Sequence, residues 1–227
     1  MSALRHPQKR LRVATAALWT LISSPATATL IFDNGPPDGT TNSYGGDTLV
    51  AYAVAEDFVL PTSAKLTGAQ FWTVESETSV WDGTLIWYIF GDNGGKPKAA
   101  PIVSGAGVNV TKALTGRIPH IENVYSFSFL RPISVLGGKP YWFGLTLGSR
   151  YDQIVWETTS LGFGSGAWVS IDAKLDNWAD SHAPLAFQLT GEPGPVHVPE
   201  PATWGMLVAA LITAALAAVA GSGRLPA

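Results

Sequence analysis

Turn-forming residues interrupt the central part of this 227-residue chain so often that few stretches are long enough for a helix. Glycine, proline, aspartate and asparagine gather at residues 33–39, 82–83, 92–95, 137–138 and 162–166. The runs between them are rich in β-branched and aromatic residues, which favour strands. The pattern therefore predicts an all-β fold whose strands are joined by tight turns.

One run shows this most clearly. Residues 125–129 read Tyr-Ser-Phe-Ser-Phe, so three aromatic side chains share one face of a strand and two serines share the other. We expect seven further strands, at residues 49–55, 69–74, 84–90, 141–147, 153–158, 168–171 and 185–189. Eight or nine strands predict a two-sheet antiparallel sandwich, jelly-roll-like in its connections.

The run at residues 84–90 is apolar on both faces, which predicts a central strand or one whose outer face is covered by a loop.

A second feature is the uncharged apolar stretch from Trp204 to Ala220. At about 1.5 Å per residue it would span roughly 26 Å as a helix, slightly less than a bilayer core. The alternative is a buried amphipathic helix, but the stretch has no polar face to turn to water. We therefore expect a separate C-terminal transmembrane helix at 204–220.

The other end of the chain has the three parts of an export signal. A basic head is followed by an apolar core at residues 13–22 and by the small-x-small triplet Ala26-Thr27-Ala28. The basic residues are Arg5, Lys9, Arg10 and Arg12. We expect residues 1–28 to be a signal peptide that is cut after Ala28.

The segment ahead of the apolar stretch reads Val198-Pro199-Glu200-Pro201, and Arg224 follows the stretch. Together with the export signal, this arrangement resembles the PEP-CTERM class of bacterial proteins. The resemblance implies that the tail anchors the exported protein in the inner membrane of a Gram-negative bacterium and that an exosortase cuts near the Pro-Glu-Pro. These four residues would be a recognition motif, and Arg224 would stay on the cytoplasmic side.

In one respect the chain departs from that class, because Arg224 stands where the class has a basic cluster. Residues 31–191 resemble, more loosely, domains often attached to such tails, through Phe32-Asp33-Asn34-Gly35 and Trp81-Asp82-Gly83 among other motifs. This second resemblance supports a sandwich and implies no activity.

These boundaries leave residues 29–192 as one extracytoplasmic domain, 193–197 as a linker and 198–227 as the sorting segment. The domain has 16 acidic and 9 basic residues, a net charge of −7, which argues against nucleic acid as a partner. The chain has no cysteine, which excludes disulfides and thiolate metal sites.

Catalytic patterns are weak. The histidines at 6, 120, 182 and 197 lack metal-ligand spacing, and no serine occupies a Gly-x-Ser-x-Gly turn. Paired carboxylates could serve a polysaccharide-active enzyme, which stays as the weakest alternative. We expect no catalytic residue.

Two groups of acidic residues could supply oxygen ligands to calcium, the one cofactor that the sequence suggests. Asp33 and Asp38 share a glycine-rich loop, and Asp172, Asp176 and Asp180 recur every four residues. The alternative is that each carboxylate caps its own turn without any metal.

Seven tryptophans lie in the domain, most of them expected in the core. Trp142 alternates with Tyr141 and Phe143, so it is predicted to point outward, while Trp81 and Trp178 lie in predicted loops. Exposed indole rings suit the apolar faces of sugars, which suggests an exopolysaccharide-binding module. Our first expectation remains a non-catalytic protein of the cell surface or extracellular matrix, with sugar binding as the alternative.

Overall fold

The computed structural model describes residues 29–39, 48–50, 52–115, 121–151, 153–162, 166–172 and 174–194. Within these ranges the protein is all-β, with twelve strands. None of these residues belongs to a helix that could serve as a membrane span. The predicted signal peptide, the sorting motif at 198–201, the helix at 204–220 and Arg224 lie outside the described residues.

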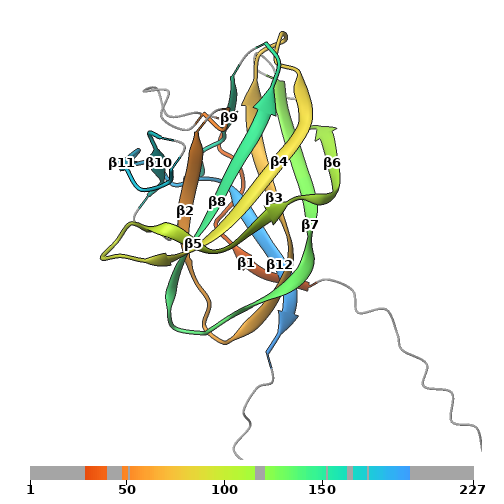
Figure 1. Ribbon diagram of the computed structural model, residues 1–227. Helices are drawn as coiled ribbons and strands as arrows, with labels where there is room; N and C mark the ends of the chain where they lie inside the picture. The colour runs from red at the N-terminus through yellow and green to blue at the C-terminus, as the bar shows by residue number, and fades with distance from the viewer. Residues whose placement is uncertain are drawn as a thin grey trace, which may run out of the picture.

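The strands form two antiparallel sheets, as the turn pattern predicted (Figure 1). Sheet A has the order β1 (Thr29–Asp33), β12 (Phe187–Pro193), β3 (Ala64–Glu75), β7 (Ile121–Val135) and β6 (Val108–Leu114), with β9 (Ile154–Trp156) also paired to β3. Sheet B has the order β11 (Trp178–Asp180), β10 (Trp168–Ser170), β2 (Ala53–Val59), β8 (Pro140–Ser149), β4 (Trp81–Asp92) and β5 (Pro97–Ala106).

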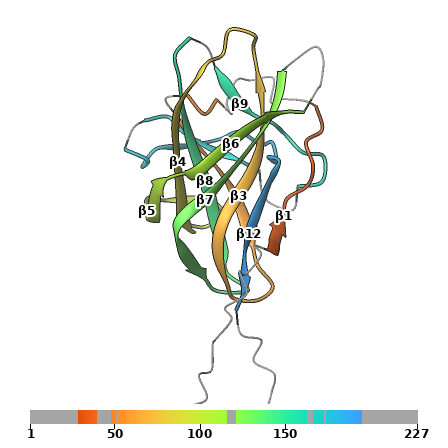
Figure 2. The same ribbon diagram turned by 90° about the vertical axis from the view of Figure 1, so that its right-hand side faces the viewer.

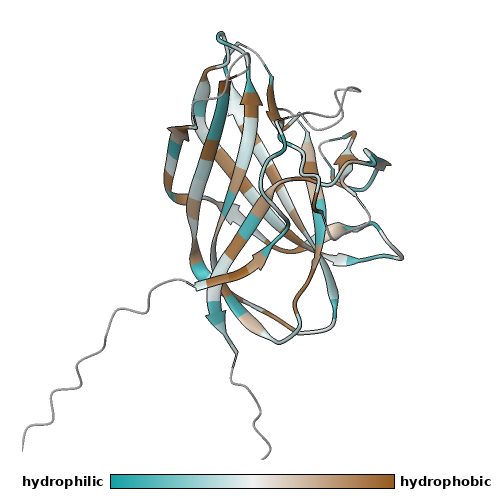
Figure 3. Cartoon of the chain, turned by 180° about the vertical axis from the view of Figure 1, so that it is seen from behind, coloured by the Kyte–Doolittle hydropathy of each residue, from teal (hydrophilic) through white to brown (hydrophobic). Residues whose placement is uncertain are grey.

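The main core lies between the sheets and is built largely from aromatic rings. On β7, Tyr125, Phe127 and Phe129 are buried while the two serines between them are half-buried, which confirms the alternation predicted for residues 125–129. The ring of Phe143 on sheet B lies 5.3 Å from that of Phe187 on sheet A. Figure 3 shows the resulting alternation of apolar and polar residues along the strands.

A smaller second core covers part of the outer face of sheet B. Phe90 and Trp142 are buried there, and the Trp178 ring packs edge-on against Phe90 at 5.2 Å. On β4 the opposite face is also buried, because Trp87 and Ile89 point into the main core. The prediction of a strand that is apolar on both faces with a covering segment is therefore confirmed.

The described chain begins and ends at the same end of the sandwich, the lower end in Figures 1 and 2. Thr29 of β1 pairs with Gly191 of β12, so the first and last strands are neighbours in sheet A. The backbone N–H of Gly194 then donates to the carbonyl of Ser63, 2.8 Å away. Strand β12 continues to Pro193, one residue beyond the predicted domain boundary.

Candidate functional site

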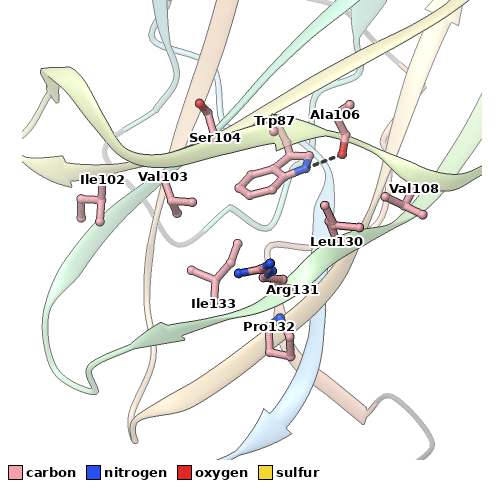
Figure 4. A pocket seen from close by; sticks show the side chains of 11 residues that line it. Trp87, Ile102, Val103, Ser104, Ala106, Val108, Leu130, Arg131, Pro132 and Ile133 are labelled. Atoms are coloured by element: carbon pink, nitrogen blue, oxygen red, sulfur yellow. Dashed lines mark hydrogen bonds between the residues drawn. The ribbon is translucent and has the colours of Figure 1, made fainter.

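An apolar pocket of about 550 Å³ opens between the two sheets along strand β5 (Figure 4). Its lining comes from four strands: Trp87 of β4 and residues 102–106 of β5 in sheet B, and Val108 of β6 with residues 130–133 of β7 in sheet A. This volume lies in the range that holds small-molecule ligands in proteins.

The pocket exists because β7 bulges away from its neighbours. Leu66 of β3 pairs with Ile133 and Gly68 pairs with Ser128, so four residues of β7 lie opposite a single residue of β3. Pro132, in the bulge, has no N–H to donate to a ladder. On the other side, β6 pairs with β7 no further than Val108 and Ser128. The bulged segment therefore lacks a strand neighbour where the pocket opens.

The chain crossing from sheet B to sheet A forms one end of the pocket. Gly107 connects β5 to β6, and its N–H donates to the carbonyl of Leu85 at 2.9 Å. A Cβ atom at this position would lie 2.8 Å from Leu85 Cδ2 and 3.2 Å from Phe127 Cδ2, which is closer than such atoms pack. Glycine thus allows the crossing to pass close over the core.

Trp87 forms the rigid floor of the pocket. Its side chain is 3% exposed, its Nε1 donates to the carbonyl of Ala106 at 3.0 Å, and its ring lies 4.5 Å from that of Phe129. The rim, by contrast, is exposed: Ile102 is 62% and Leu130 is 76% accessible. A floor of fixed aromatic rings and a rim of exposed aliphatic side chains are properties of a binding surface.

Arg131 is the charged residue of the pocket lining. Figure 4 shows its side chain between Ile133 and Leu130, below the Trp87 ring. Among the described residues the guanidinium has no ion pair and no hydrogen-bond partner. A guanidinium carries five donors, so this one is available to a ligand.

A second hollow, of about 420 Å³, meets the pocket at Ile102. Lys98 and Lys139 both line it. Its one carboxylate, Asp92, already accepts hydrogen bonds from the N–H groups of Gly94 and Gly95 and from Trp142 Nε1. Three basic side chains and one carboxylate therefore line the two openings.

The prediction that Trp142 points into solvent is wrong. The ring does face away from Tyr141 and Phe143, as the alternation requires, but it is only 1% exposed. Strands β10 and β11 and the segment between them cover this face of sheet B and enclose the ring in the smaller core. The cover comes from residues distant in sequence, so the local alternation could not reveal it.

The other two candidate tryptophans are half-buried and hydrogen-bonded within the protein. Trp81 Nε1 donates to the carbonyl of Thr84 at 2.8 Å, and its ring packs edge-on against Tyr125 at 5.4 Å. Trp178 Nε1 donates to the carbonyl of Leu175 at 2.9 Å. The structure brings Trp178 and Trp142 into one cluster, while Trp81 packs against the main core.

The first pair of calcium candidates is engaged in separate local contacts. Asp33 accepts hydrogen bonds from the N–H of Gly35 and from Gln188 Nε2, at 2.9 and 3.1 Å. Asp38 accepts one from Thr158 Oγ1 at 2.8 Å. Within the described part of the chain, no group of three His, Cys, Asp or Glu side chains is arranged to hold a metal ion.

In the second group the structure brings two of the three carboxyls together. The hydrogen bond with Asp172, followed by desolvation, raises the pKa of Asp176. Desolvation opposes ionisation of Asp172, but hydrogen bonds from Asp176 and from the backbone N–H of Lys174 hold its pKa below the ordinary value. Asp180 instead pairs with His182 Nδ1 at 2.9 Å. The two neighbouring carboxyls thus shift each other's pKa in opposite directions.

Sequence patterns did not reveal a buried polar cluster around Glu75, which is 3% exposed. Its Oε1 accepts hydrogen bonds from Thr73 Oγ1 and the Tyr125 hydroxyl, both at 2.9 Å, and its Oε2 lies 2.6 Å from Lys112 Nζ. Burial, reinforced by the Glu75 carboxylate, raises the pKa of Tyr125. All these partners come from β3, β6 and β7, so the cluster ties these strands together.

The chain matched no protein-family model, no curated protein and no solved structure in the three comparisons made.

Proposed function

We propose that this chain is an exported, non-catalytic component of the cell envelope or extracellular matrix of a Gram-negative bacterium. In this proposal the signal at residues 1–28 directs export, and the helix at 204–220 anchors the protein in the inner membrane. An exosortase then recognises Val198-Pro199-Glu200-Pro201 and transfers or releases the sandwich. We also propose that the strands of the sandwich are connected in a jelly-roll-like order.

The pairing of Thr29 with Gly191 carries this proposal. Because the first and last strands are neighbours, both targeting segments attach at one end of the domain, and neither interrupts a strand. A cut after Ala28 leaves β1 whole, and a cut near Pro199 leaves β12 whole. The arrangement supports processing at both sites, because every core contact among the described residues lies between the two cuts.

The experiment replaces Pro199, Glu200 and Pro201 by alanine in a host that contains an exosortase. The helix keeps all its apolar residues, so the variant still inserts but should accumulate uncut in the inner membrane. Fractionation and immunoblotting measure the distribution. Processing of this variant at the parent's rate would refute the recognition role.

The chain offers a matched control in a second Glu-Pro pair, Glu192 and Pro193. Both residues are exposed at the end of β12. Replacing this pair by alanine makes a similar chemical change a few residues upstream of the motif. The control should be processed like the parent, which separates motif recognition from a general effect near the tail.

Carbohydrate binding is the second candidate function. It rests on three half-buried aromatic rings, Tyr88, Trp168 and Trp178, that lie in one cluster on the outer face of sheet B. Partly exposed rings of this kind can stack on sugars. In affinity electrophoresis through exopolysaccharide, Trp168→Ala should reduce the retardation of the protein, and equal retardation of parent and variant would remove this candidate.

A further inference from the structure

We propose that the pocket between β5 and β7 binds an anionic amphiphile, a molecule with a long apolar chain and a negatively charged head group. This site is independent of the sorting mechanism and of the aromatic cluster on sheet B. The proposal rests on the shape and composition of the pocket, on Arg131, which has no partner among the described residues, and on the distribution of charge over the domain.

The apolar chain is indicated by the floor and the rim. Trp87 is held in place by its hydrogen bond to Ala106 and by Phe129, so the floor is formed before any ligand arrives. Ile102 and Leu130 lie exposed at the rim, where an apolar ligand would remove them from water. A sugar would find few side-chain partners for its hydroxyl groups, because Ser104 and Arg131 are the polar side chains of this lining.

The anionic head is indicated by Arg131, whose guanidinium lies in the pocket without a protein partner among the described residues. Lys98 and Lys139 line the adjoining hollow beyond Ile102. The domain carries a net charge of −7, yet three of its nine basic residues surround these two openings. This local reversal of charge attracts an anion to the mouth of an apolar pocket.

The probe is palmitic acid with a diazirine near the chain end and a terminal alkyne, applied to lysate of cells that express the full chain. Irradiation attaches the probe to nearby residues, and mass spectrometry locates the labelled peptides. We expect saturable labelling of residues 97–108 and 130–133. Unmodified palmitate should compete, and palmityl alcohol, which has the same chain but no charge, should compete about fivefold less well.

Variants test the two halves of the proposal separately. Arg131→Gln should reduce saturable labelling about fivefold and remove the preference for palmitate over the alcohol. Arg150→Gln is the matched control, because it changes the net charge equally at an exposed position outside the pocket lining.

Ile102→Glu should abolish labelling, whereas Ile171→Glu, at an exposed position on the β10 side, should not. Both isoleucines are exposed, so these variants keep the core intact.

A second arm uses phosphatidylglycerol with the same photoreactive chain, to separate a free fatty acid from a membrane lipid as the source of the ligand. Labelling of the pocket by either probe supports the proposal if Arg131→Gln reduces it. The probe that labels the pocket then identifies the ligand as a free fatty acid or as a membrane lipid. Labelling confined to other parts of the chain, or equal competition by the alcohol, would overturn the proposal.

Discussion

Tyr125 shows how a single buried hydroxyl affects the stability of the fold at alkaline pH. Burial and the Glu75 carboxylate raise its pKa above the ordinary value of 10.0, so the folded protein keeps this proton after the unfolded chain has lost it. The stabilisation is fully present below pH 10 and is lost as the pH rises further. Above pH 10 the free energy of unfolding should fall by about 1.4 kcal/mol per pH unit on account of Tyr125.

Urea unfolding of the parent and of Tyr125→Phe between pH 9 and 11.5 measures this effect. The other tyrosines are common to both proteins, so the difference in slope isolates Tyr125. At pH 7 the variant should be less stable by about 1 to 2 kcal/mol, because it loses the hydrogen bond to Glu75. If the free energies of unfolding of parent and variant fell with the same slope above pH 10, the Tyr125 hydroxyl would ionise as readily in the folded protein as in the unfolded chain, which would contradict this prediction.

Trp142 gives a second prediction at the scale of one residue. The ring is 1% exposed and fills the smaller core, so Trp142→Ala should lower the free energy of unfolding by about 3 to 5 kcal/mol. Trp178→Ala, at a half-buried ring in the same cluster, should cost less. Denaturant unfolding compares the two, and a loss below 1 kcal/mol for Trp142→Ala would mean that the cover over sheet B is readily displaced.

Among the elements, β7 could be predicted from the sequence because its side chains repeat with a period of two, and β4 because turn-forming residues bound a continuous run of β-branched and aromatic residues. Strands β5 and β6, which line the pocket, could not. Strand β5 contains Pro97 and Pro101, which are tolerated because it is the edge strand of sheet B. Most of its residues are exposed and only Pro97 is buried, so no run of core-facing apolar residues marks it. The pocket was missed for the same reason, since its walls come from this strand and from a bulge set by long-range pairing.

The register between β3 and β7 gives a prediction at the scale of elements. A Cβ atom at Gly68 would lie 2.5 Å from the backbone oxygen of Phe127, which cannot move without shifting β7. Gly68→Ala should therefore destabilise the protein by about 2 to 3 kcal/mol. At Gly91 a Cβ atom would meet the Lys98 side chain at 3.4 Å, an ordinary contact, so Gly91→Ala is the matched control. Equal thermal stability of the two variants would contradict the register described here.

For the whole molecule, composition and turn spacing were sufficient to predict an all-β fold of two antiparallel sheets, because hydrophobic periodicity is a local property. The cover over Trp142 and the hydrogen bond between Asp38 and Thr158 were not predictable, because each depends on segments far apart in the chain. Asp33 and Asp172, by contrast, accept hydrogen bonds from backbone N–H groups two residues further on, as the alternative of turn capping expected. The pairing of Thr29 with Gly191 could not be predicted either, because it joins the first and last strands and depends on the order of strands in sheet A.

The central claim, export followed by processing at both ends, is tested most directly by the intact mass of the protein recovered from the envelope of an exosortase-containing host. The account predicts a chain that begins at Thr29, where β1 begins, and that ends near Pro199-Glu200-Pro201 without residues 204–220. A mass that retains Met1 or Ser2, or one that retains the apolar segment in all of the recovered protein, would contradict it.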